Sequence, residues 1–587
     1  MENLDIARTL TLLADLLEIQ GANPFRIRAY RTAVNTVNGL SKPLHSMVEA
    51  GEDLTALPGV GKNVASHIVE LLGTGTIGRL EEVEAEIPRT LAELMALDGV
   101  GPKKAKRLFD ELGVRTVQDL DDALEAKKVE GLEGFGVRSA EKIRVAIAEH
   151  RQHTGRFRID EVEKLIAGLL SHVADAPGAE RVEVAGSLRR RKETIGDVDI
   201  LVQCRGDGTP VTEHFVAFEG AARAESAGPT KGSIVLHSGL QVDLRVVPPA
   251  SFGAALVYFT GSKDHNVAIR TRAVRERLRV NEWGVFRVPE GVDPETLGKD
   301  EGERLAGETE EGVYESLGMR WVPPVLRESR GEIEASREGT LPRLVELGDI
   351  RGDLQMHSTW SDGNTSIEEM ARACAGLGYE YLAVTDHSQA MAMVQGLTPE
   401  RARAQWEEVA EVRKLVPEIE ILTSAEVDIL KHGELDLPDD ILDVLDLVVI
   451  SVHSLMDQDR KTMTDRVLRA MAHPSVDILA HPTGRRINRR EPFELDVEAV
   501  LEAAAEHSVA VELNANPRRL DLNEVHVHRA KDLGVPVVIS TDAHSPAGLM
   551  DMRFGVDQAR RGWLEASDVL NTRPLSEFRA WLGRRSS

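Results

Sequence analysis

The feature that most constrains the fold of this chain is a repeated pattern of apolar strand and helix over residues 348–587. Seven apolar runs each end in a polar side chain of the kind that binds ligands. The seven end positions are 357, 387, 426, 453, 481, 514 and 542, in steps of 30, 39, 27, 28, 33 and 28 residues. One strand and one helix fill each step, so the pattern predicts βα units that form a parallel sheet or barrel.

The polar residues at these strand ends include five histidines and three carboxylates. In barrels, functional groups lie at the C-terminal ends of the strands, so we expect these side chains to converge. One such histidine alone would indicate a core or surface residue, but eight groups together predict a metal centre. Imidazole mixed with carboxylate suits Zn²⁺, Mn²⁺ or Fe²⁺ better than Mg²⁺. The eight are His357, Asp362, His387, Glu426, His453, His481, Asp542 and His544.

A second acidic cluster is predicted on strands near the middle of the chain. Asp197 and Asp199 are two residues apart in an alternating segment, so both carboxylates face the same side of a strand. Asp243 lies in another alternating segment, 241–247. Close carboxylates repel each other unless a cation lies between them. Three of them predict an oxygen-rich site for two Mg²⁺ (or Mn²⁺) ions, which promote phosphoryl transfer.

The surroundings of this triad favour a catalytic role. A lone Asp-x-Asp is more often a pair of solvated acids on a strand edge. Here Gly186 and Ser187 precede the strand, and basic residues fill positions 189–192. We expect that basic run to bind nucleic acid, together with five further arginines. These are Arg270, Arg272, Arg275, Arg277 and Arg279.

Three Gly-rich turns repeat near the N-terminus, at 57–65, 97–105 and 132–140. Each has the form hydrophobic-x-Gly-hydrophobic-Gly-x-x-x-Ala. Glycines allow a tight turn that points backbone N–H groups outward at a helix N-terminus, where they bind phosphate without reading a base. One copy would indicate only a Gly-capped hairpin, but three copies with nearby Lys or Arg favour contact with a nucleic-acid backbone. The expected contact residues are Gly59, Gly61, Lys62, Gly99 and Gly101.

Composition excludes several classes of protein. Hydrophobic residues make up 42% of the 587, which excludes disorder as the overall state, and the length predicts about four domains. Two cysteines exclude a disulfide framework and fit a reducing compartment. No apolar run approaches the roughly 18 residues of a membrane span. The net charge of −26 argues only weakly against nucleic acid, because local patches decide.

The segment after the acidic strands carries a resemblance to a known family. Tyr258-Phe259-Thr260-Gly261-Ser262-Lys263-Asp264-His265-Asn266, with the Gly-Ser and Asp-x-Asp elements, resembles the palm of an X-family DNA polymerase, similar to DNA polymerase beta. The Gly-rich turns resemble helix-hairpin-helix motifs, and the likeness spans about residues 1–325. It implies roles in nucleotide binding for seven residues. Gly186, Ser187 and Arg190 would hold the triphosphate, and Tyr258, Phe259, Gly261 and Asn266 would line the sugar and base.

One position departs from that family. In members with lyase activity, a lysine in the helix after the first hairpin forms a Schiff base with an abasic sugar. The corresponding residue here is His67. An imidazole cannot form that imine, and Lys62 lies at a different position of the motif. We therefore expect this chain to lack an efficient 5′-deoxyribose-phosphate lyase.

The C-terminal part resembles the PHP family, named for polymerases and histidinol phosphatases, whose fold is a seven-unit distorted barrel with a trinuclear metal site. The eight ligand candidates match the family's positions, and Mn²⁺ or Zn²⁺ is the expected metal. The family's first motif is His-x-His, and its first histidine is Gln355 here. An amide oxygen is a weaker ligand, so we expect one metal to bind loosely at a functional site. Arg485 and Arg518 are candidates to hold substrate phosphate, with a solvated loop as an equal alternative.

These observations predict a multidomain α+β and α/β fold. It comprises a helical helix-hairpin-helix region, a nucleotidyltransferase palm and thumb, and a C-terminal distorted (β/α)₇ barrel. The expected domains are an N-terminal helical DNA-binding domain at 1–90, a fingers-like helix-hairpin-helix domain at 91–155, the palm at 156–255, the thumb at 256–325, a linker at 326–347, and the PHP metallo-phosphoesterase barrel at 348–587.

The resemblance implies template-directed filling of DNA gaps from dNTPs during repair, with hydrolysis at 3′ ends by the barrel. The expected partners are gapped or nicked DNA and dNTPs, with no membrane contact. We expect a monomer in the cytoplasm, associated with the nucleoid. Three alternatives stay open: a non-templated nucleotidyltransferase, a DNA-binding scaffold with degenerate sites, and a phosphomonoesterase for small molecules. The intact triad, the ligand set and the three hairpins argue against them.

Overall fold

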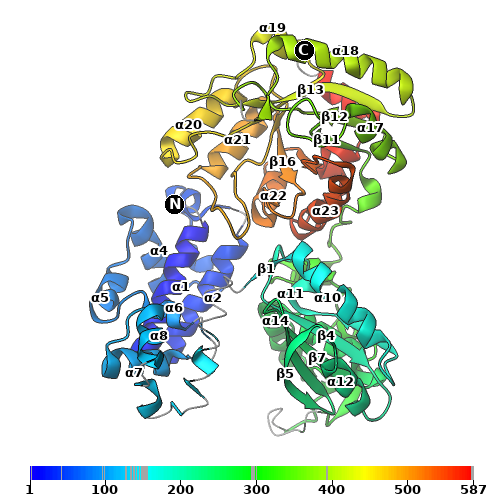
Figure 1. The fold of residues 1–587 in the computed structure, drawn as a ribbon. Coiled ribbons are helices and arrows are strands. Elements are labelled where there is room, and N and C mark those ends of the chain that lie inside the picture. Colours follow the sequence, from blue (N-terminus) through cyan, green and yellow to red (C-terminus); the bar gives the residue numbers. More distant parts are fainter. Residues whose placement is uncertain are drawn as a thin grey trace. The chain divides into compact units, whose positions relative to one another are not determined.

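The computed structural model of the chain describes residues 1, 3–40, 42–95, 97, 100–125, 128–132, 135–136, 139–140, 142–144, 146, 156–292, 298, 300–391 and 394–583. The chain divides into two compact units, Met1–Arg156 and Phe157–Ser587 (Figure 1). Among the described residues, no helix is both long enough and apolar enough to cross a membrane.

The first unit is helical, as the spacing of its apolar residues predicts. Leu10, Leu13, Leu16 and Leu17 are fully buried in its core. Its helices are α1 (Asn3–Gln20), α2 (Pro24–Gly39), α3 (Leu44–Glu49), α4 (Lys62–Thr74), α5 (Gly78–Glu86), α6 (Leu91–Leu94), α7 (Pro102–Leu112) and α8 (Val117–Glu125).

The predicted Gly-rich turns precede α4 and α7, which begin directly after Gly61 and Gly101. Gly59 has a φ of +73°, and a Cβ there would lie 2.3 Å from Cγ2 of Thr32. Only glycine fits, because the turn closes against α2 and its backbone is left-handed. Gly99 of the second turn lies outside the described residues, as do Glu133, Gly134, Val137 and Arg138 of the third.

The second unit begins with a five-stranded mixed sheet. Its strand order is β2-β4-β7-β6-β5, with β4 parallel to β7. The strands are β2 (Arg181–Val184), β4 (Asp197–Gln203), β5 (Ala221–Gly228), β6 (Lys231–Leu236) and β7 (Gln241–Val247). A short pair, β1 (Phe157–Arg158) and β3 (Thr194–Ile195), lies outside this sheet. The bounds of β4 and β7 are those that the alternation predicts.

Side chains of β4 alternate between two faces, which positions the acids. Val198 and Ile200 are buried in a core shared with α10 (Ile159–Ala174) and α12 (Thr209–Val216). Leu201 belongs to the opposite face and packs against α13 (Phe252–Thr260). Successive strand residues point to opposite faces, so the odd-numbered acids of β4 share the α13 face.

A smaller α/β region follows the sheet. It contains α14 (Lys263–Arg275), α15 (Glu310–Glu315) and a three-stranded sheet of order β10-β9-β8. The strands are β8 (Leu278–Asn281), β9 (Gly284–Arg287) and β10 (Glu303–Ala306). Its core includes Val257, Ile269 and Tyr314.

The segment predicted to be a linker, 326–347, is folded. It contains α16 (Glu332–Glu338) and contributes Leu326, Ile333 and Leu344 to the neighbouring core. The fully buried Glu332 lies 2.5 Å from Nδ1 of His265. A buried polar group requires such a partner, so this segment is anchored to α14 and differs from a flexible connection.

The rest of the unit is the predicted barrel. Seven parallel strands pair in chain order: β11 (Gly352–Met356), β12 (Tyr381–Val384), β13 (Glu420–Asp428), β14 (Leu447–Ser451), β15 (Ile478–Leu479), β16 (Ala510–Asn514) and β17 (Val537–Ser540). An isolated parallel bridge from Met356 to Ala543 links the first strand to the segment after the last, so the sheet nearly closes. The connecting helices are α17 (Ile367–Gly376), α18 (Pro399–Leu415), α19 (Asp439–Leu442), α20 (Arg460–Met471), α21 (Val497–His507), α22 (Glu524–Asp532) and α23 (Met552–Arg561).

A further helix, α24 (Leu575–Leu582), packs against one end of the barrel. Its buried Phe578 stacks on Tyr381, the first residue of β12, with ring centroids 4.8 Å apart. Phe578 also shares a core with Leu354 and Leu422 of the strands. The helix therefore covers the N-terminal ends of the strands and leaves the C-terminal ends to the polar residues. The predicted fold class is confirmed.

Candidate active sites

The predicted acidic triad forms on the α13 face of the five-stranded sheet. Parallel pairing of β4 with β7 places Asp199 directly opposite Asp243. Burial and the charges of Asp197 and Asp243 raise the pKa of Asp199 to about 6. Oδ1 of Asp243 is buried and has no hydrogen-bond partner among the described residues, and Nζ of Lys231 lies 3.9 Å from Oδ2. Repelling carboxylates with an unsatisfied oxygen are the donor set that divalent cations neutralise, so the triad fits metal ions.

A short helix lies against this triad. Helix α11 (Gly186–Arg189) begins at Gly186, whose φ is +61°. A Cβ at that position would lie 2.7 Å from Oδ2 of Asp199. Glycine thus permits the first residue of α11 to approach Asp199 closely. The Arg190 guanidinium contributes to the electrostatic environment of Asp199.

The aromatic segment lies where α13 meets α14. Gly261, with a φ of +69°, joins the two helices, and Nη1 of Arg190 would lie 3.3 Å from a Cβ placed there. Phe259 and Tyr258 pack edge to face, with centroids 5.2 Å apart. The guanidinium of Arg245, from β7, lies 5.2 Å from the Phe259 ring.

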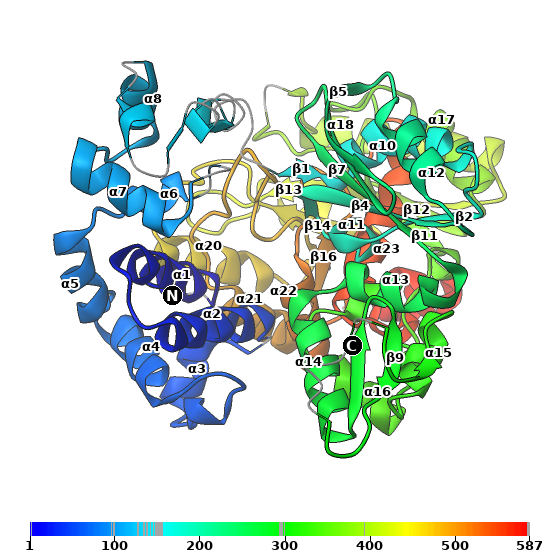
Figure 2. The ribbon, with the colours of Figure 1, turned by 90° about the horizontal axis from the view of Figure 1, so that it is seen from below.

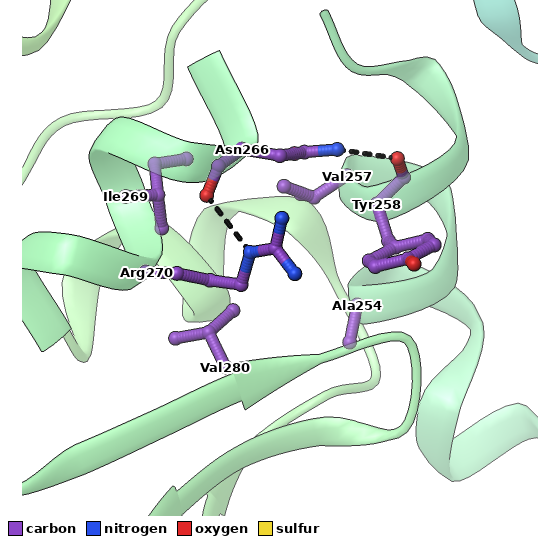
Figure 3. Close-up of a pocket in the computed structure, with 7 residues that line it drawn as sticks. All are labelled: Ala254, Val257, Tyr258, Asn266, Ile269, Arg270 and Val280. Atoms are coloured by element: carbon purple, nitrogen blue, oxygen red, sulfur yellow. Dashed lines mark hydrogen bonds between the residues drawn. The ribbon is translucent and has the colours of Figure 1, made fainter. Parts of the chain in front are cut away.

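Asn266 and Arg270 are engaged with their neighbours in a small pocket lined by α13, α14 and β8 (Figure 3). The Asn266 amide donates to the carbonyl of Tyr258 at 2.6 Å. Nε of Arg270 donates to the backbone carbonyl of Asn266 at 3.3 Å, and the Arg270 guanidinium lies 6.0 Å from the centroid of the Tyr258 ring. Asn266 must therefore exchange one hydrogen bond for another before its amide can contact a nucleotide.

Binding of nucleic acid by the basic run 189–192 stays a prediction, and the structure gives its three arginines partners within the chain, among them Glu328 for Arg190 at 3.0 Å. Arg189 forms an ion pair with Glu310 at 2.8 Å, and Arg191 lies 2.6 Å from Asp557. Burial lowers the pKa of Lys192. The carboxylate partners of Arg189 and Arg191 come from distant parts of the sequence. Of the five later arginines, Arg270, Arg275 and Arg277 are exposed.

The eight predicted ligands of the barrel converge. Two sets have ligand atoms that all lie within 4.8 Å of one another, and they share one residue: His357, Asp362, His387 and His544, and then His387, Glu426 and His453. Nε2 of His481 lies 3.0 Å from Oε1 of Glu426. Nε2 of His357 lies 3.1 Å from Oδ1 of Asp542, so the last two candidates join the same cluster.

Several buried polar atoms of this cluster lie near other ligand atoms but have no hydrogen-bond partner within the part of the chain that the structure describes. They include both ring nitrogens of His357, Nδ1 of His387, Nδ1 of His481 and Oε2 of Glu426. Buried polar atoms are normally hydrogen-bonded, so this donor set fits metal ions. Burial opposes protonation of His387, but Glu426 and Asp362 raise its pKa to about 9. Metal binding must therefore displace protons.

Gln355 lies two residues before His357 on β11 and is 1% exposed. Neither its Oε1 nor its Nε2 has a hydrogen-bond partner among the residues that the structure describes. An unsatisfied buried amide is costly and calls for an explanation. A bound cation beside His357 supplies one, since the amide oxygen is a neutral oxygen donor.

Sequence patterns missed two residues of this site. Nε of Arg519 lies 3.3 Å from Oδ2 of Asp542 and balances its charge. Glu512 is fully buried; its Oε2 accepts from the backbone N–H of His481 at 2.6 Å, and burial raises its pKa well above the usual value. Glu512 lies two residues before Asn514, the end of a predicted strand, and this spacing is the only sequence pattern that points to it.

The first unit positions His67 on α4, beside α2. Nδ1 of His67 hydrogen-bonds with the hydroxyl of Tyr30 at 2.9 Å, and the two rings stack. Burial lowers the pKa of His67, and the charges of Arg26 and Arg79 lower it further. Lys62, at the start of α4, is exposed. A neutral imidazole thus lies near the positive charges of Arg26 and Arg79, and this arrangement suits an anionic ligand.

The two folds and their centres define a class: a metal-dependent nucleotidyltransferase joined in one chain to a barrel metallophosphoesterase. Residues 255–328 match the DNA polymerase beta thumb, and residues 353–516 match the PHP domain. Residues 1–77 match a helix-hairpin-helix domain, and residues 91–149 match a SAM-like helix-hairpin-helix tandem.

One relative matches the whole chain and another matches about half of it. The DNA polymerase/3′-5′ exonuclease PolX of Bacillus subtilis (strain 168) is 39% identical over 586 residues, 100% of each chain. DNA polymerase lambda of Rattus norvegicus is 27% identical over 351 residues, 56% of each chain. The chain belongs to the X family of DNA polymerases, among the members that carry a C-terminal PHP domain.

Replacing Asp199 by asparagine should stabilise the metal-free protein. The pKa of Asp199 is raised to about 6, so ionisation penalises the folded state as pH rises from about 4 through 6. In EDTA at pH 8, Asp199→Asn should melt at a higher temperature than the wild type, because its free energy of unfolding is larger by up to about 3 kcal/mol. This difference should shrink near pH 4.5. The exposed Glu219→Gln is the control. No gain at pH 8 would show that the triad carries no repulsion.

Gln355→His should strengthen metal binding at an already functional centre. An imidazole is a stronger donor than the buried amide, so the Kd of the weakest-bound Mn²⁺ should fall about tenfold. Chelator competition and the metal content of the purified protein measure this without reference to activity. Wild-type protein purified without chelator should already hold two or more metal ions. A metal-free wild type would contradict this and mark Gln355 as the sign of an inactive site.

Proposed function

We propose that this protein fills short DNA gaps in repair with one metal site and degrades DNA 3′ ends with the other. The observation that supports this most is the presence of two separate clusters of metal-ligand side chains in one chain. One is the carboxylate triad of β4 and β7, and the other is the imidazole-rich cluster of the barrel. Membership of the X family supports the same assignment.

In the polymerase site, Asp197 and Asp199 hold Mg²⁺ or Mn²⁺ together with Asp243. When bound, the cations stabilise charge on the entering and leaving oxygens of phosphoryl transfer. Oδ1 of Asp243, which has no partner among the described residues, accepts the proton of the primer 3′-hydroxyl or orients that group. Ser187 and Arg190 hold the triphosphate of the incoming dNTP, because Gly186 lets α11 approach Asp199.

The sugar and base of the nucleotide lie against the segment between α13 and α14. Tyr258 and Phe259 supply the aromatic surface, and Gly261 gives the backbone room for close approach. Asn266 contributes its amide to the base once it releases the Tyr258 carbonyl.

In the barrel, the eight ligands and Gln355 hold Mn²⁺ or Zn²⁺. Five imidazoles favour these ions over Mg²⁺. Three exposed arginines lie on loops that follow barrel strands and hold the phosphates of the DNA strand: Arg486, Arg489 and Arg518. Burial and Arg519 lower the pKa of Arg486, and Arg518 and Arg489 add to that effect, as expected where positive charge gathers. Arg485 serves differently, because its Nη2 lies 2.6 Å from Glu193.

DNA is held first through its backbone. The N–H groups after Gly59 and Gly61, with the exposed Lys62, offer donors and a cation at the start of α4. Gly101 repeats the arrangement before α7, and Gly99 is assigned the same role from sequence. We place the protein on the nucleoid, in the cytoplasm, and its monomeric state remains a prediction.

Substitutions at the two metal sites should separate the two activities. Asp199→Ala should abolish dNTP addition on a gapped duplex and leave 3′-end degradation intact. His453→Ala should do the reverse, and degradation by the wild type should be faster with Mn²⁺ than with Mg²⁺. A labelled primer, with and without dNTPs and with each metal, reads both activities. Loss of both activities in Asp199→Ala, or full degradation in His453→Ala with Mg²⁺, would overturn the two-site assignment.

The first unit should bind a 5′-phosphate without efficient Schiff-base chemistry. Neutral His67 cannot form an imine, and a phosphate beside Lys62 favours the charged, unreactive amine. Borohydride trapping on a 5′-deoxyribose-phosphate substrate should be weak and should rise in His67→Lys. Gap binding should be retained in that variant. Strong trapping by the wild type that vanishes in Lys62→Ala would instead identify Lys62 as the nucleophile.

A further inference from the structure

A buried charge cluster joins the nucleotide loop to the barrel. Helix α23 of the barrel lies beside α11 of the polymerase part (Figure 2). Arg561, the last residue of α23, is 2% exposed and contacts residues from three segments. We call Arg190, Glu328, Glu524 and Arg561 the Glu328 cluster.

Within this cluster, one carboxylate oxygen serves two guanidinium groups. Oε1 of Glu328 accepts from Nε of Arg190 at 3.0 Å and from Nη1 of Arg561 at 3.1 Å. Nη2 of Arg561 is held on its other side by Glu524 at 2.9 Å. The hold of Glu328 on Arg190 is therefore shared with an arginine that the barrel supplies.

Glu328 is ionised at neutral pH. Burial would raise the pKa of its carboxyl, but the charges of Arg561, Lys192 and Arg190 hold it at about 2. Charge-assisted hydrogen bonds of this kind are strong. When one cation is removed, Glu328 binds the remaining cations more tightly. An Arg190 tied to Glu328 is not available to the triphosphate of a nucleotide.

We infer that Arg561 of the barrel is a positioning residue of the polymerase nucleotide site: it binds Glu328 and so loosens the hold of that carboxylate on Arg190. The donation from Nη1 of Arg561 to the backbone carbonyl of Arg190, at 2.6 Å, acts in the same direction because it fixes the end of α11. The inference rests on the proposed role of Arg190 in binding the triphosphate.

Other ion pairs attach the barrel to the polymerase part without touching Glu328. Arg553 of α23 pairs with Glu163 of α10 at 2.7 Å, and Arg191 pairs with Asp557 at 2.6 Å. If Arg561 acted only by docking the barrel, loss of these pairs would have the same effect. Arg553→Met is therefore the matched control.

The first test measures KM for dNTP and kcat on a gapped duplex with the full chain. Arg561→Met should raise KM about tenfold and change kcat by less than about twofold, since it weakens binding of the triphosphate equally in the ground state and in the transition state. Arg553→Met should leave both constants unchanged. Thermal melting and 3′-end degradation by the barrel report whether each variant folds.

A double-mutant cycle separates electrostatic positioning from structure. Glu328→Gln removes the competing carboxylate, so its KM should equal or fall below that of the wild type. In the Glu328→Gln background, Arg561→Met should raise KM less than about threefold. The remaining effect is the lost hydrogen bond from Arg561 to the backbone carbonyl of Arg190. A purely structural role of Arg561 predicts the same increase in both backgrounds and would overturn the inference.

If Arg561→Met fails to fold, a further variant that should lower KM for dNTP tests the same inference. Glu524→Gln removes the other partner of Arg561, so Arg561 should bind Glu328 more tightly and KM for dNTP should fall. A rise in KM would contradict the inference. Arg190→Ala separates the two levels: an unchanged KM in that variant refutes the assignment of Arg190 itself. A raised KM there, with none in Arg561→Met, refutes only the role of Arg561.

Discussion

The parallel pairing of β4 with β7 is the constraint on which the polymerase site depends. Its register sets Asp199 opposite Asp243, and a slip of one residue would turn one of the acids into the apolar core. The register is held by buried residues such as Val198 and Ile200 on the other face. Apolar packing on one face of these strands thus stabilises the fold, and the carboxylates on the other face repel one another. A cation relieves that repulsion, so metal binding and local stability are coupled here.

Strand positions and the metal ligands were predictable from the sequence because they follow local periods. Alternation predicted the bounds of β4 and β7 to the residue, and six of the eight candidate ligands of the barrel stand at the ends of the thirty-residue steps. The bounds of β15 were not predictable, because it pairs through only Ile478 and Leu479. The folded segment around Glu332 was not predictable either, since its partner His265 lies on another helix.

Long-range ion pairs mark the limit of sequence reasoning most clearly. A run of basic residues at 189–192 has the pattern of a nucleic-acid patch, and no local signal shows that Arg189 pairs with Glu310 or Arg191 with Asp557. Sequence gives the charge of a side chain but not the direction it takes. Buried pairs contribute little net stability compared with apolar contacts, yet removing one partner is costly. The pair of Arg191 with Asp557 therefore fixes how the polymerase part and the barrel are joined, and the pair of Arg189 with Glu310 fixes α11 against α15, more than either pair adds to stability.

The order of the barrel strands has a consequence for how the metal centre is assembled. The strands pair in chain order, so each βα unit can add to the one before it during folding. The ligands, however, come from nearly every unit, and His357 from the first strand stacks on His544 from the end of the last. The candidate ligands at the two ends of the barrel sequence meet only where the last βα unit lies beside the first, so the centre is complete only in the nearly closed barrel.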